Sequence, residues 1–402
     1  MTVMELKNGV FWNGVLDPNL RVFDIIMQTE FGTTYNSYTV KGSEKTALVE
    51  TAKLKFYDEY KRSVESITPI DKIDYIIVNH TEPDHSGSLE NIIKLNPCAK
   101  VVGSAAAINF LKNIVNCEFG SIAVKDGDSI SLGDKTLRFL SAPNLHWPDT
   151  MYTYIEEDKV LFTCDSFGSH YCYDKVLRST LSDTDGYLRA AKYYFDNIIG
   201  PFKNPFMTNA LKKIEPLEID MICPGHGPVL DSHIDELLKL YRDWCRPEPQ
   251  HEHKQAVIAY VSAYGYTKQL AQAISQGLES TGEVDVKLFD MSECDFVTVS
   301  AELAKSDGFL LGTPTILGEA LPPIWALASS MLATVYKGKV ASAFGSFGWS
   351  GEGVPHIIER LNQLKITVLE GYTVKFKPSS AEIEEAREFG KRFASALLKQ
   401  SS

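Results

Sequence analysis

Hydrophobic and polar positions alternate differently in two parts of the chain. In the first part, short apolar runs bounded by turn residues predict buried strands at Lys45–Ala52, Asp74–Asn79, Lys100–Gly103 and Met221–Cys223. Two pairs of runs predict hairpins, Ser129–Leu132 with Lys135–Leu140 and Met151–Ile155 with Val160–Cys164. Helical spacing appears between them at Phe56–Ile67, Ser88–Leu95, Ala105–Val115 and Gly186–Ile199. Strand-rich sequence with interspersed helices indicates sheets covered by helices, an α+β sandwich.

In the second part, strand and helix patterns alternate regularly. Strands are predicted at Ala256–Ser262, Val284–Asp290, Gly308–Gly312, Val340–Gly345 and Thr367–Val374. Helices are predicted at Thr267–Ser280, Ala301–Lys305, Pro323–Thr334, Val354–Leu364 and Ala381–Lys399. This order predicts an α/β domain with a doubly wound, five-stranded parallel sheet, which binds its ligand at the carboxyl ends of the strands.

A polar segment separates the two patterns. Residues 246–255 carry two prolines and no apolar periodicity, which is typical of a linker. We therefore expect one domain over residues 1–247 and a second over residues 254–402. Both lengths suit single domains, and no internal repeat or low-complexity tract is found.

Composition narrows the class of protein. The 44% hydrophobic and 23% charged residues indicate a globular chain, and no apolar run reaches about 18 residues, so no membrane span is expected. The first residues lack the pattern of a signal peptide, and the seven cysteines are scattered and never form CxxC, so we expect a cytoplasmic protein without a rubredoxin-type or zinc-ribbon site. A net charge of −12 argues against nucleic acid and anionic membranes as partners.

Potential metal ligands follow four of the predicted strands. The stretch 79–88 contains His80, Glu82, Asp84 and His85, and three later segments add His146, Asp165 and His226. Because strand ends can meet at one sheet edge, these seven donors could converge on two metal ions. For the first stretch alone, the alternative is a polar loop in which Asp84 or Ser88 caps a helix. His233, His251, His253 and His356 lie outside this pattern, and we interpret them as structural or solvated residues.

This arrangement resembles the metallo-β-lactamase superfamily, whose dizinc hydrolases carry a histidine where this chain has Glu82. An additional carboxylate favours iron or manganese over zinc. The form H-x-E-x-D-H resembles the flavodiiron proteins. The resemblance implies that His80, Glu82 and His146 bind one iron, that Asp84, His85 and His226 bind the other, and that Asp165 bridges both. His170 and the pair Tyr193–Tyr194 are candidates for catalytic hydrogen-bond or proton donors, although helix packing alone is an alternative for the tyrosines.

Three loops of the second part suit a flavin. The first strand runs into a helix through Ser262, Tyr264, Gly265, Tyr266 and Thr267, where backbone N–H groups can surround a phosphate. The segment resembles the flavodoxin phosphate loop, except that Tyr264 replaces a hydroxyl amino acid. The loops after the third and fourth strands contribute Pro314, Thr315, Ile316, Leu317, Gly318, Ser346, Phe347, Gly348, Trp349 and Gly351. We expect Trp349 to stack on the isoalloxazine ring of FMN, the alternative being a glycine-rich turn beside a core tryptophan. The sequence contains no G-x-G-x-x-G motif, so we do not expect it to bind a nicotinamide cofactor directly.

A metallo-β-lactamase-like αββα sandwich followed by a flavodoxin-like domain is the architecture of the flavodiiron proteins. The resemblance implies a non-haem diiron oxidoreductase that reduces dioxygen to water, nitric oxide to nitrous oxide, or both. It implies FMN, two iron ions and an external rubredoxin-like electron donor. It also implies a head-to-tail homodimer or a dimer of dimers, which brings the flavin of one subunit to the irons of the other. Two alternatives remain at this point: a dizinc hydrolase fused to a redox flavodoxin, and a flavin electron carrier whose metal site is inactive.

Overall fold

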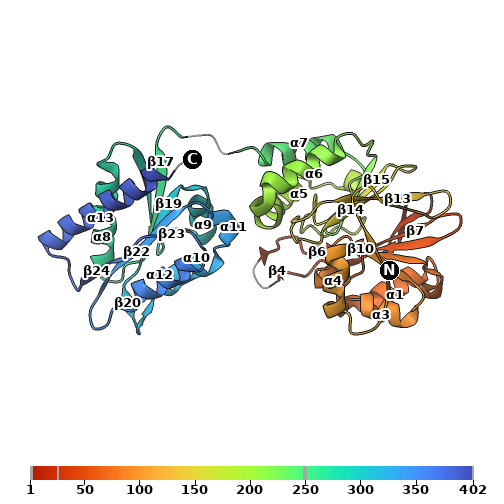
Figure 1. The fold of residues 1–402 in the computed structure, drawn as a ribbon, viewed down its shortest axis with the longest axis horizontal. Coiled ribbons are helices and arrows are strands. Elements are labelled where there is room, and N and C mark those ends of the chain that lie inside the picture. Colours follow the sequence, from red (N-terminus) through yellow and green to blue (C-terminus); the bar gives the residue numbers. More distant parts are fainter. Residues whose placement is uncertain (1–2, 25–26, 248–250, 401–402) are drawn as a thin grey trace. The chain divides into compact units, whose positions relative to one another are not determined.

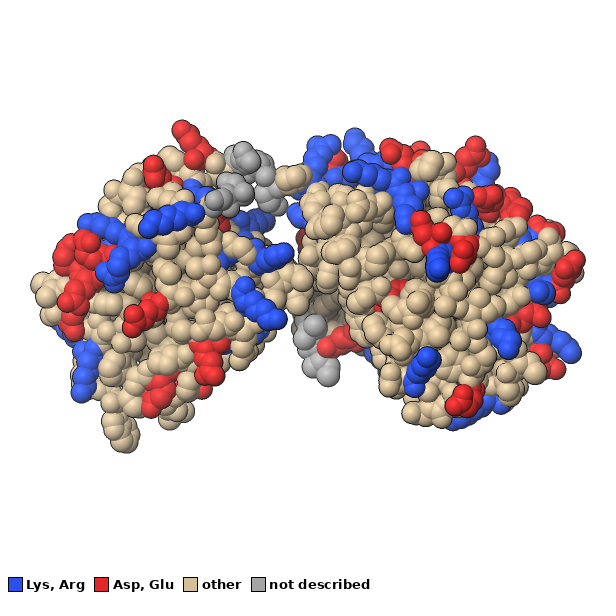
Figure 2. All heavy atoms as spheres, viewed as in Figure 1, with Lys and Arg blue, Asp and Glu red and all other residues tan. Residues whose placement is uncertain are grey.

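The computed structural model describes residues 3–24, 27–247 and 251–400, and the chain divides into two compact units, Met1–Arg246 and Pro247–Ser402 (Figure 1). Of the predicted linker 246–255, residues 248–250 lie outside the described residues. None of the described helices is both long and apolar enough to cross a membrane. Acidic and basic side chains are interspersed over the visible face of each unit (Figure 2).

The first unit contains two β-sheets. Strands of the seven-stranded sheet follow in the order β1 (Met4–Lys7), β2 (Val10–Trp12), β7 (Tyr38–Lys41), β8 (Thr46–Val49), β9 (Tyr75–Ile77), β10 (Lys100–Ser104) and β11 (Gly120–Val124). Those of the five-stranded sheet are β12 (Ser129–Ser131), β13 (Thr136–Ser141), β14 (Met151–Ile155), β15 (Val160–Cys164) and β16 (Met221–Pro224). Two small two-stranded sheets pair β3 (Val15–Asp17) with β6 (Thr33–Tyr35) and β4 (Val22–Phe23) with β5 (Met27–Gln28).

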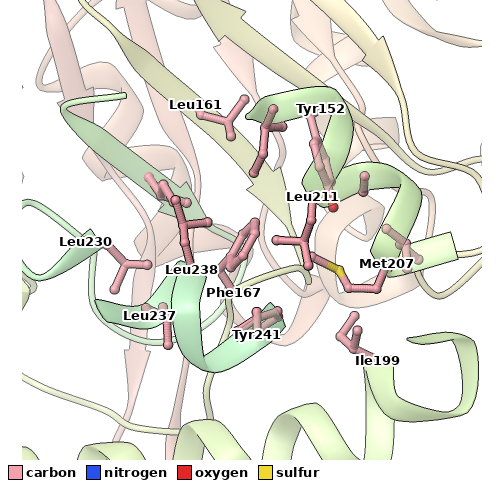
Figure 3. Packing of buried hydrophobic residues seen from close by; sticks show 14 of the residues in the cluster. Tyr152, Leu161, Phe167, Ile199, Met207, Leu211, Leu230, Leu237, Leu238 and Tyr241 are labelled. Atoms are coloured by element: carbon pink, nitrogen blue, oxygen red, sulfur yellow. The ribbon is translucent and has the colours of Figure 1, made fainter. Parts of the chain in front are cut away.

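Alternating strand residues divide the core of this unit into three layers. Val49 and Ile77 of the first sheet share a cluster with Phe139 and Phe162 of the second, so the sheets pack face to face. The neighbouring residues of β8, β9 and β10 face a second cluster with helices α1 (Tyr57–Glu65), α3 (Leu89–Leu95) and α4 (Ala105–Ile114). On the far side, β14, β15 and β16 pack against α5 (Thr184–Tyr194), α6 (Thr208–Ile214) and α7 (Ile234–Trp244), where Leu161, Leu211 and Tyr241 meet (Figure 3). The predicted αββα sandwich is confirmed.

Short helical segments fill the connections of the first unit. They are α2 (Pro83–Ser86) and the 3₁₀ turns Leu54–Phe56, Ile70–Lys72, Arg178–Thr180 and Gly200–Phe202, together with wider turns at Phe195–Ile199 and Lys203–Met207. The helix predicted over Gly186–Ile199 therefore ends as an α-helix at Tyr194.

The second unit is built on one parallel sheet. Its strand order is β18 (Val284–Asp290), β17 (Lys254–Tyr260), β19 (Gly308–Gly312), β22 (Val340–Phe347) and β23 (Thr367–Val368), and β24 (Tyr372–Lys375) also pairs with β22. One face carries α9 (Phe296–Lys305), α10 (Pro322–Ser330), α11 (Ala333–Tyr336) and α12 (Gly353–Asn362), and the other carries α8 (Tyr266–Glu279) and α13 (Ser380–Lys399). This is the predicted flavodoxin-like doubly wound sheet.

One predicted strand and one predicted helix of this unit are each divided in the structure. The single fifth strand predicted over Thr367–Val374 is two short strands, β23 and β24, which pair with different parts of β22. The single helix predicted over Pro323–Thr334 is likewise divided, because α10 ends at Ser330 and α11 begins at Ala333. The small hairpin β20 (Thr315–Ile316) and β21 (Glu319–Ala320) follows β19 and lies at the carboxyl edge of the sheet.

Candidate metal centre and flavin site

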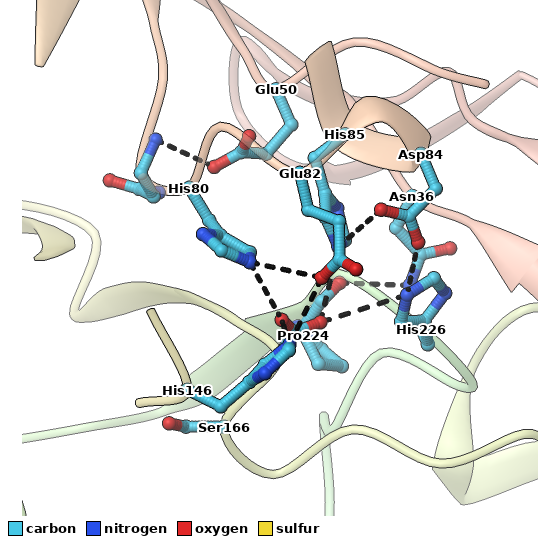
Figure 4. Close-up of polar contacts among 12 residues, drawn as sticks. Asn36, Glu50, His80, Glu82, Asp84, His85, His146, Ser166, Pro224 and His226 are labelled. Atoms are coloured by element: carbon cyan, nitrogen blue, oxygen red, sulfur yellow. Dashed lines mark hydrogen bonds and ion pairs between the residues drawn. The ribbon is translucent and has the colours of Figure 1, made fainter. Parts of the chain in front are cut away.

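The seven predicted metal ligands lie together at the strand ends of the first unit. His80 follows β9, Asp165 follows β15 and His226 follows β16, while His146 lies in the loop between β13 and β14. Glu82, Asp84 and His85 lie at and within α2. Figure 4 labels six of the seven, all but Asp165, and shows their side chains pointing toward one another.

The ligand atoms form two groups in which all members lie within 4.8 Å of one another. One group comprises His80, Glu82, His146 and Asp165, and the other comprises Asp84, His85 and His226. These are the groups that the resemblance assigned to the two irons.

Asp165 lies between the two groups. Its Oδ2 is 3.5 Å from Nε2 of His80 and 3.4 Å from Nε2 of His146, whereas its Oδ1 is 3.1 Å from Nε2 of His85 and 3.6 Å from Nε2 of His226. Each carboxylate oxygen therefore faces one group, as a bridging ligand requires.

The donor set fits cations. Glu82 Oε2 lies 3.0 Å from His146 Nε2, and Asp84 Oδ2 lies 3.0 Å from His226 Nε2. Among the described residues, the buried Asp84 Oδ1 and Asp165 Oδ2 have no hydrogen-bond partner. Imidazole nitrogens and carboxylate oxygens that converge in this way suit two divalent metal ions.

The pKa values of the histidines and of Asp165 in the centre are strongly shifted. Burial alone opposes charge on His80, His85 and His146, but hydrogen bonds to carboxylates and their negative charge outweigh it and raise the pKa of each to about 10. Burial likewise favours a neutral Asp165, but His85 and His146 hold the pKa of this carboxyl well below its usual value. Metal ions must therefore displace protons from these imidazoles.

Two outer contacts orient the histidines. Nδ1 of His80 lies 3.3 Å from Oδ2 of Asp149, and Nδ1 of His226 lies 2.6 Å from the carbonyl oxygen of Thr34. A carbonyl or carboxylate oxygen only accepts, so both Nδ1 atoms carry hydrogen and both Nε2 atoms are available to a metal. Asp149 and Thr34 were not predicted, although Asp149 lies in the same short segment as His146.

The backbone after β16 packs closely against the ring of His85 at Gly225. A Cβ atom on Gly225 would lie 2.6 Å from Cε1 of His85, so only glycine allows this approach. The backbone of Gly225 is fixed, because its N–H donates to Cys164 at 2.6 Å and its carbonyl accepts from Asn36 at 2.9 Å.

The predicted outer residues behave differently. Tyr194 is buried and donates a hydrogen bond to Asp165 Oδ1 at 2.9 Å; burial and the charge of Asp165 raise the pKa of this phenol well above its usual value. His170 lies 4.9 Å from Tyr194 between ring centroids, and its Nδ1 contacts Thr33 Oγ1 at 2.9 Å. Burial holds the pKa of His170 well below its usual value. Tyr193 instead packs against the cluster beneath α1, α3 and α4.

A cavity of about 620 Å³ opens at the carboxyl edge of the parallel sheet in the second unit. It is lined by Tyr264, Tyr266, Pro314, Thr315, Ile316, Ser346, Phe347, Gly348, Trp349, Lys375 and Phe376. Gly265 has a φ of +80° and immediately precedes the 14-residue helix α8, whose N-terminus can receive a phosphate. Trp349 is 97% exposed and free to cover a flat ring. The cavity therefore fits FMN.

The remaining predicted flavin residues are not among those that line this cavity. Ser262 accepts from the backbone N–H of Lys268, and the buried Thr267 contacts Ser346 between hydroxyls at 3.4 Å. Leu317 and Gly318 form the exposed tip between β20 and β21, and Gly351 packs on the ring of Phe347. Lys375 and Phe376 were not predicted; their signal is their place at the end of the strand that pairs with Phe347.

Comparison with known families agrees with both units. A family model described as ODP family beta lactamase matches residues 33–227, and a flavodoxin model matches residues 258–390. Together, the fold and the donor set define a flavin- and metal-dependent oxidoreductase.

Relatives and solved structures extend over the whole chain. Flavo-diiron protein FprA2 of Clostridium acetobutylicum is 42% identical, with 99% of this chain and 100% of the relative covered. A protein named nitric oxide reductase from Moorella thermoacetica is 36% identical, with 98% of both chains covered. The crystal structure of the flavodiiron protein from Giardia intestinalis gives a TM-score of 0.72 at 30% identity and 99% and 97% coverage. Rubredoxin oxygen:oxidoreductase from Desulfovibrio gigas gives 0.73 at 26% identity and 99% coverage of both chains.

The chain belongs to the flavodiiron protein family, and its cofactors are FMN and a non-haem diiron centre. The predicted family and cofactors are confirmed.

Proposed function

We propose that this oxidoreductase reduces dioxygen to water, nitric oxide to nitrous oxide, or both. The observation that carries the proposal is the position of Asp165, whose two oxygens face two separate groups of ligands. Two metal ions about 3.5–4 Å apart can act together on one small molecule. The names of the Moorella and Desulfovibrio proteins support nitric oxide and dioxygen, respectively, as substrates.

In the proposed centre, His80, Glu82 and His146 would hold one iron and Asp84, His85 and His226 the other, with one oxygen of Asp165 turned toward each group. Bound in these sites, iron and FMN would supply the electrons for reducing the diatomic substrate. Tyr194 holds a proton beside Asp165, and neutral His170 lies next to Tyr194; we propose that both act as hydrogen-bond or proton donors toward the site.

In the flavin site, we propose that Ser262, Gly265, Tyr266 and Thr267 hold the phosphate at the start of α8. Pro314, Thr315 and Ile316 with Leu317 and Gly318, and Ser346 through Trp349 with Gly351, enclose the ring. Tyr264 lies at the rim of the cavity, where its ring can cover the ribityl chain.

Electrons come from outside the chain in this proposal. The sequence contains no CxxC pair that could hold a rubredoxin-type iron, which agrees with a separate, rubredoxin-like donor. The name of the Desulfovibrio gigas protein supports this donor class.

We further propose a head-to-tail homodimer, or a dimer of such dimers, in the cytoplasm. Apolar side chains around the flavin cavity support a covering subunit, since Trp349 is 97% and Leu317 is 99% exposed. Sedimentation combined with kinetics tests this: a strictly monomeric enzyme with full activity would contradict it.

The dizinc hydrolase, which was the alternative at the level of sequence, is disfavoured, because the chain belongs to the flavodiiron family and Glu82 lies among the ligands. Elemental analysis separates the two, because two equivalents of zinc with hydrolytic activity would favour the hydrolase.

Anaerobic stopped-flow spectroscopy tests the function directly. The full-length holoenzyme is reduced chemically and mixed separately with dioxygen and with nitric oxide, after its iron and FMN have been counted. We expect rapid reoxidation by at least one of them. Asp165→Ala and His146→Ala should abolish it while FMN remains bound. Stoichiometric iron without reoxidation by either gas would favour an electron carrier with an inactive centre.

A further inference from the structure

Glu50 is a buried carboxylate that the proposed metal assignment does not use. It follows β8 directly, is 2% exposed and adopts a left-handed backbone with φ of +59°. Its N–H donates to Ile77 at 2.9 Å, its carbonyl accepts from Ser37 Oγ at 2.9 Å, and its Oε1 accepts from the N–H of Asn79 at 2.8 Å. These contacts fix the residue in a conformation that is unfavourable outside glycine.

The other carboxylate oxygen of Glu50, Oε2, makes no hydrogen bond to the described residues. Among the described residues, Glu50 Oε2 is buried without a hydrogen-bond partner, and the same holds for His85 Nδ1. Glu50, His85 and Cys164 each offer one donor atom within 4.8 Å of the others. Figure 4 shows Glu50 beside the His85 backbone turn.

The chain next to Glu50 also holds His85. Both the N–H and the hydroxyl of Thr51 donate to the carbonyl oxygen of His85, at 2.8 and 2.7 Å. Meanwhile Nε2 of His85 faces Asp165 Oδ1 at 3.1 Å. One side of the imidazole therefore faces the metal centre, and the residue is tied to the end of β8 through its backbone.

Two other histidines of the centre, His80 and His226, have a hydrogen-bond acceptor at Nδ1, whereas His85 has none among the described residues. His80 has Asp149 at its Nδ1, and His226 has the carbonyl of Thr34. Such outer acceptors fix the tautomer and the ring orientation of a metal-binding histidine. A buried carboxylate oxygen without a partner, near a buried imidazole nitrogen without a partner, is the corresponding pair for His85.

We infer that Glu50 is the positioning residue of His85. In the iron-loaded protein, its Oε2 accepts the hydrogen of His85 Nδ1, which leaves the Nε2 lone pair to the iron that Asp84 and His226 also hold. Oε1 keeps its contact with the N–H of Asn79, so the two oxygens of Glu50 serve different partners. The inference rests on the proposed ligand assignment.

Glu50→Gln reverses the polarity of this contact. The amide oxygen can still accept from Asn79, so the NH₂ group turns toward His85 Nδ1 and donates. The hydrogen of the imidazole then lies on Nε2, which can no longer bind iron. We expect a chelator to remove one of the two irons about 10–100-fold faster from the full-length variant than from the wild type. In Mössbauer spectra, one iron environment should change and the other should stay.

Asp149→Ala is the matched variant, because it removes the acceptor of His80 Nδ1 and should perturb the other iron. Cys164→Ala removes the third member of the Glu50 cluster and should release iron at the wild-type rate. In a His85→Ala background, Glu50→Gln should have no further effect on iron release, since Glu50 acts through His85. A merely structural Glu50 would give an additive effect.

Equal iron release from wild type and Glu50→Gln, or full additivity with His85→Ala, would overturn the inference. If Glu50→Gln does not fold, Glu50→Asp keeps the carboxyl group but withdraws it by one methylene, and the same cycle with His85→Ala applies. A wild type that binds two irons but reduces neither gas would refute the proposed function and leave this test intact.

Discussion

The hydroxyl of Tyr194 donates to Oδ1 of Asp165 at 2.9 Å, and both side chains are at least 98% buried. The same oxygen faces His85 and His226, whereas Oδ2 faces His80 and His146. The phenol therefore withdraws electron density from one side only of the proposed bridge. Hydrogen bonds to an ionised acceptor typically contribute about 1.5–3 kcal/mol, so this contact is large enough to tune the centre.

Replacing Tyr194 by Phe should alter the redox properties of the centre without emptying it. Without the donor, Asp165 becomes a stronger ligand and favours the oxidised metal, so we expect a lower reduction potential and slower turnover, with two irons retained. Redox titration followed by EPR, together with iron analysis, measures this. Tyr193→Phe is the control, because Tyr193 packs in the α1, α3 and α4 cluster. Unchanged potentials in Tyr194→Phe would contradict the tuning role.

Gly225→Ala should lower iron content. The added Cβ would lie 2.6 Å from His85 Cε1, and hydrogen bonds to Cys164 and Asn36 prevent the backbone from retreating. His85 must then turn away from Asp165. Iron per chain and its rate of release measure the effect. Gly127→Ala is the control, since its Cβ would meet nothing within 4 Å and only the φ of +85° is strained. Full iron content in Gly225→Ala would show that the loop can shift.

Trp349→Ala should weaken FMN binding about tenfold, because stacking of an aromatic ring contributes about 0.5–1.5 kcal/mol beyond the area that it buries. Fluorescence titration of the deflavinated full-length protein measures the dissociation constant. Leu332→Ala is a suitable control, as Leu332 is exposed in the same unit but does not line the cavity. Equal affinities for all three proteins would place the tryptophan outside the flavin contact.

From the sequence it could be predicted that the seven candidate ligands converge, but not which residues lie behind them. His80, Asp165 and His226 could be predicted because each follows a strand, and parallel neighbours such as β15 and β16 end at the same edge. The partners of the imidazoles come from positions fixed only by tertiary packing. Thr34 lies on β6, 192 residues before His226, and no local pattern announces that its carbonyl faces an imidazole.

The N-terminal strands are a second feature that could not be predicted from the sequence. Strands β1 to β7 have two to four residues each, too few for an apolar period, and their pairing is set by distant partners. In the second unit, the break at 369–371 divides the last strand and places Lys375 at the flavin cavity, beside Phe347. A continuous strand was predicted there because the apolar residues on both sides of the break share one alternation.

Lys339 should make the stability of the second unit depend on pH. Burial lowers its pKa to about 8 from the usual 10.5, although Asp307 acts in the opposite direction, and its ammonium donates to the carbonyl of Ser306. Below pH 8 both folded and unfolded chains hold the proton, and the folded chain bears the cost of the buried charge. Between pH 8 and 10.5 only the unfolded chain holds it, so the contribution of Lys339 to the free energy of unfolding rises with pH.

Lys339→Met removes this charge and should stabilise the unit below pH 8 by at most about 3 kcal/mol, an advantage that fades toward pH 10.5. Calorimetry of the full-length protein, with FMN release marking the transition of the second unit, measures the difference from wild type at each pH. Lys337→Met is the control, since Lys337 is exposed two residues earlier and other alkaline titrations affect both variants alike. A Lys339→Met protein that is less stable than wild type at pH 7 would mean that the bond to Ser306 outweighs the cost of burial.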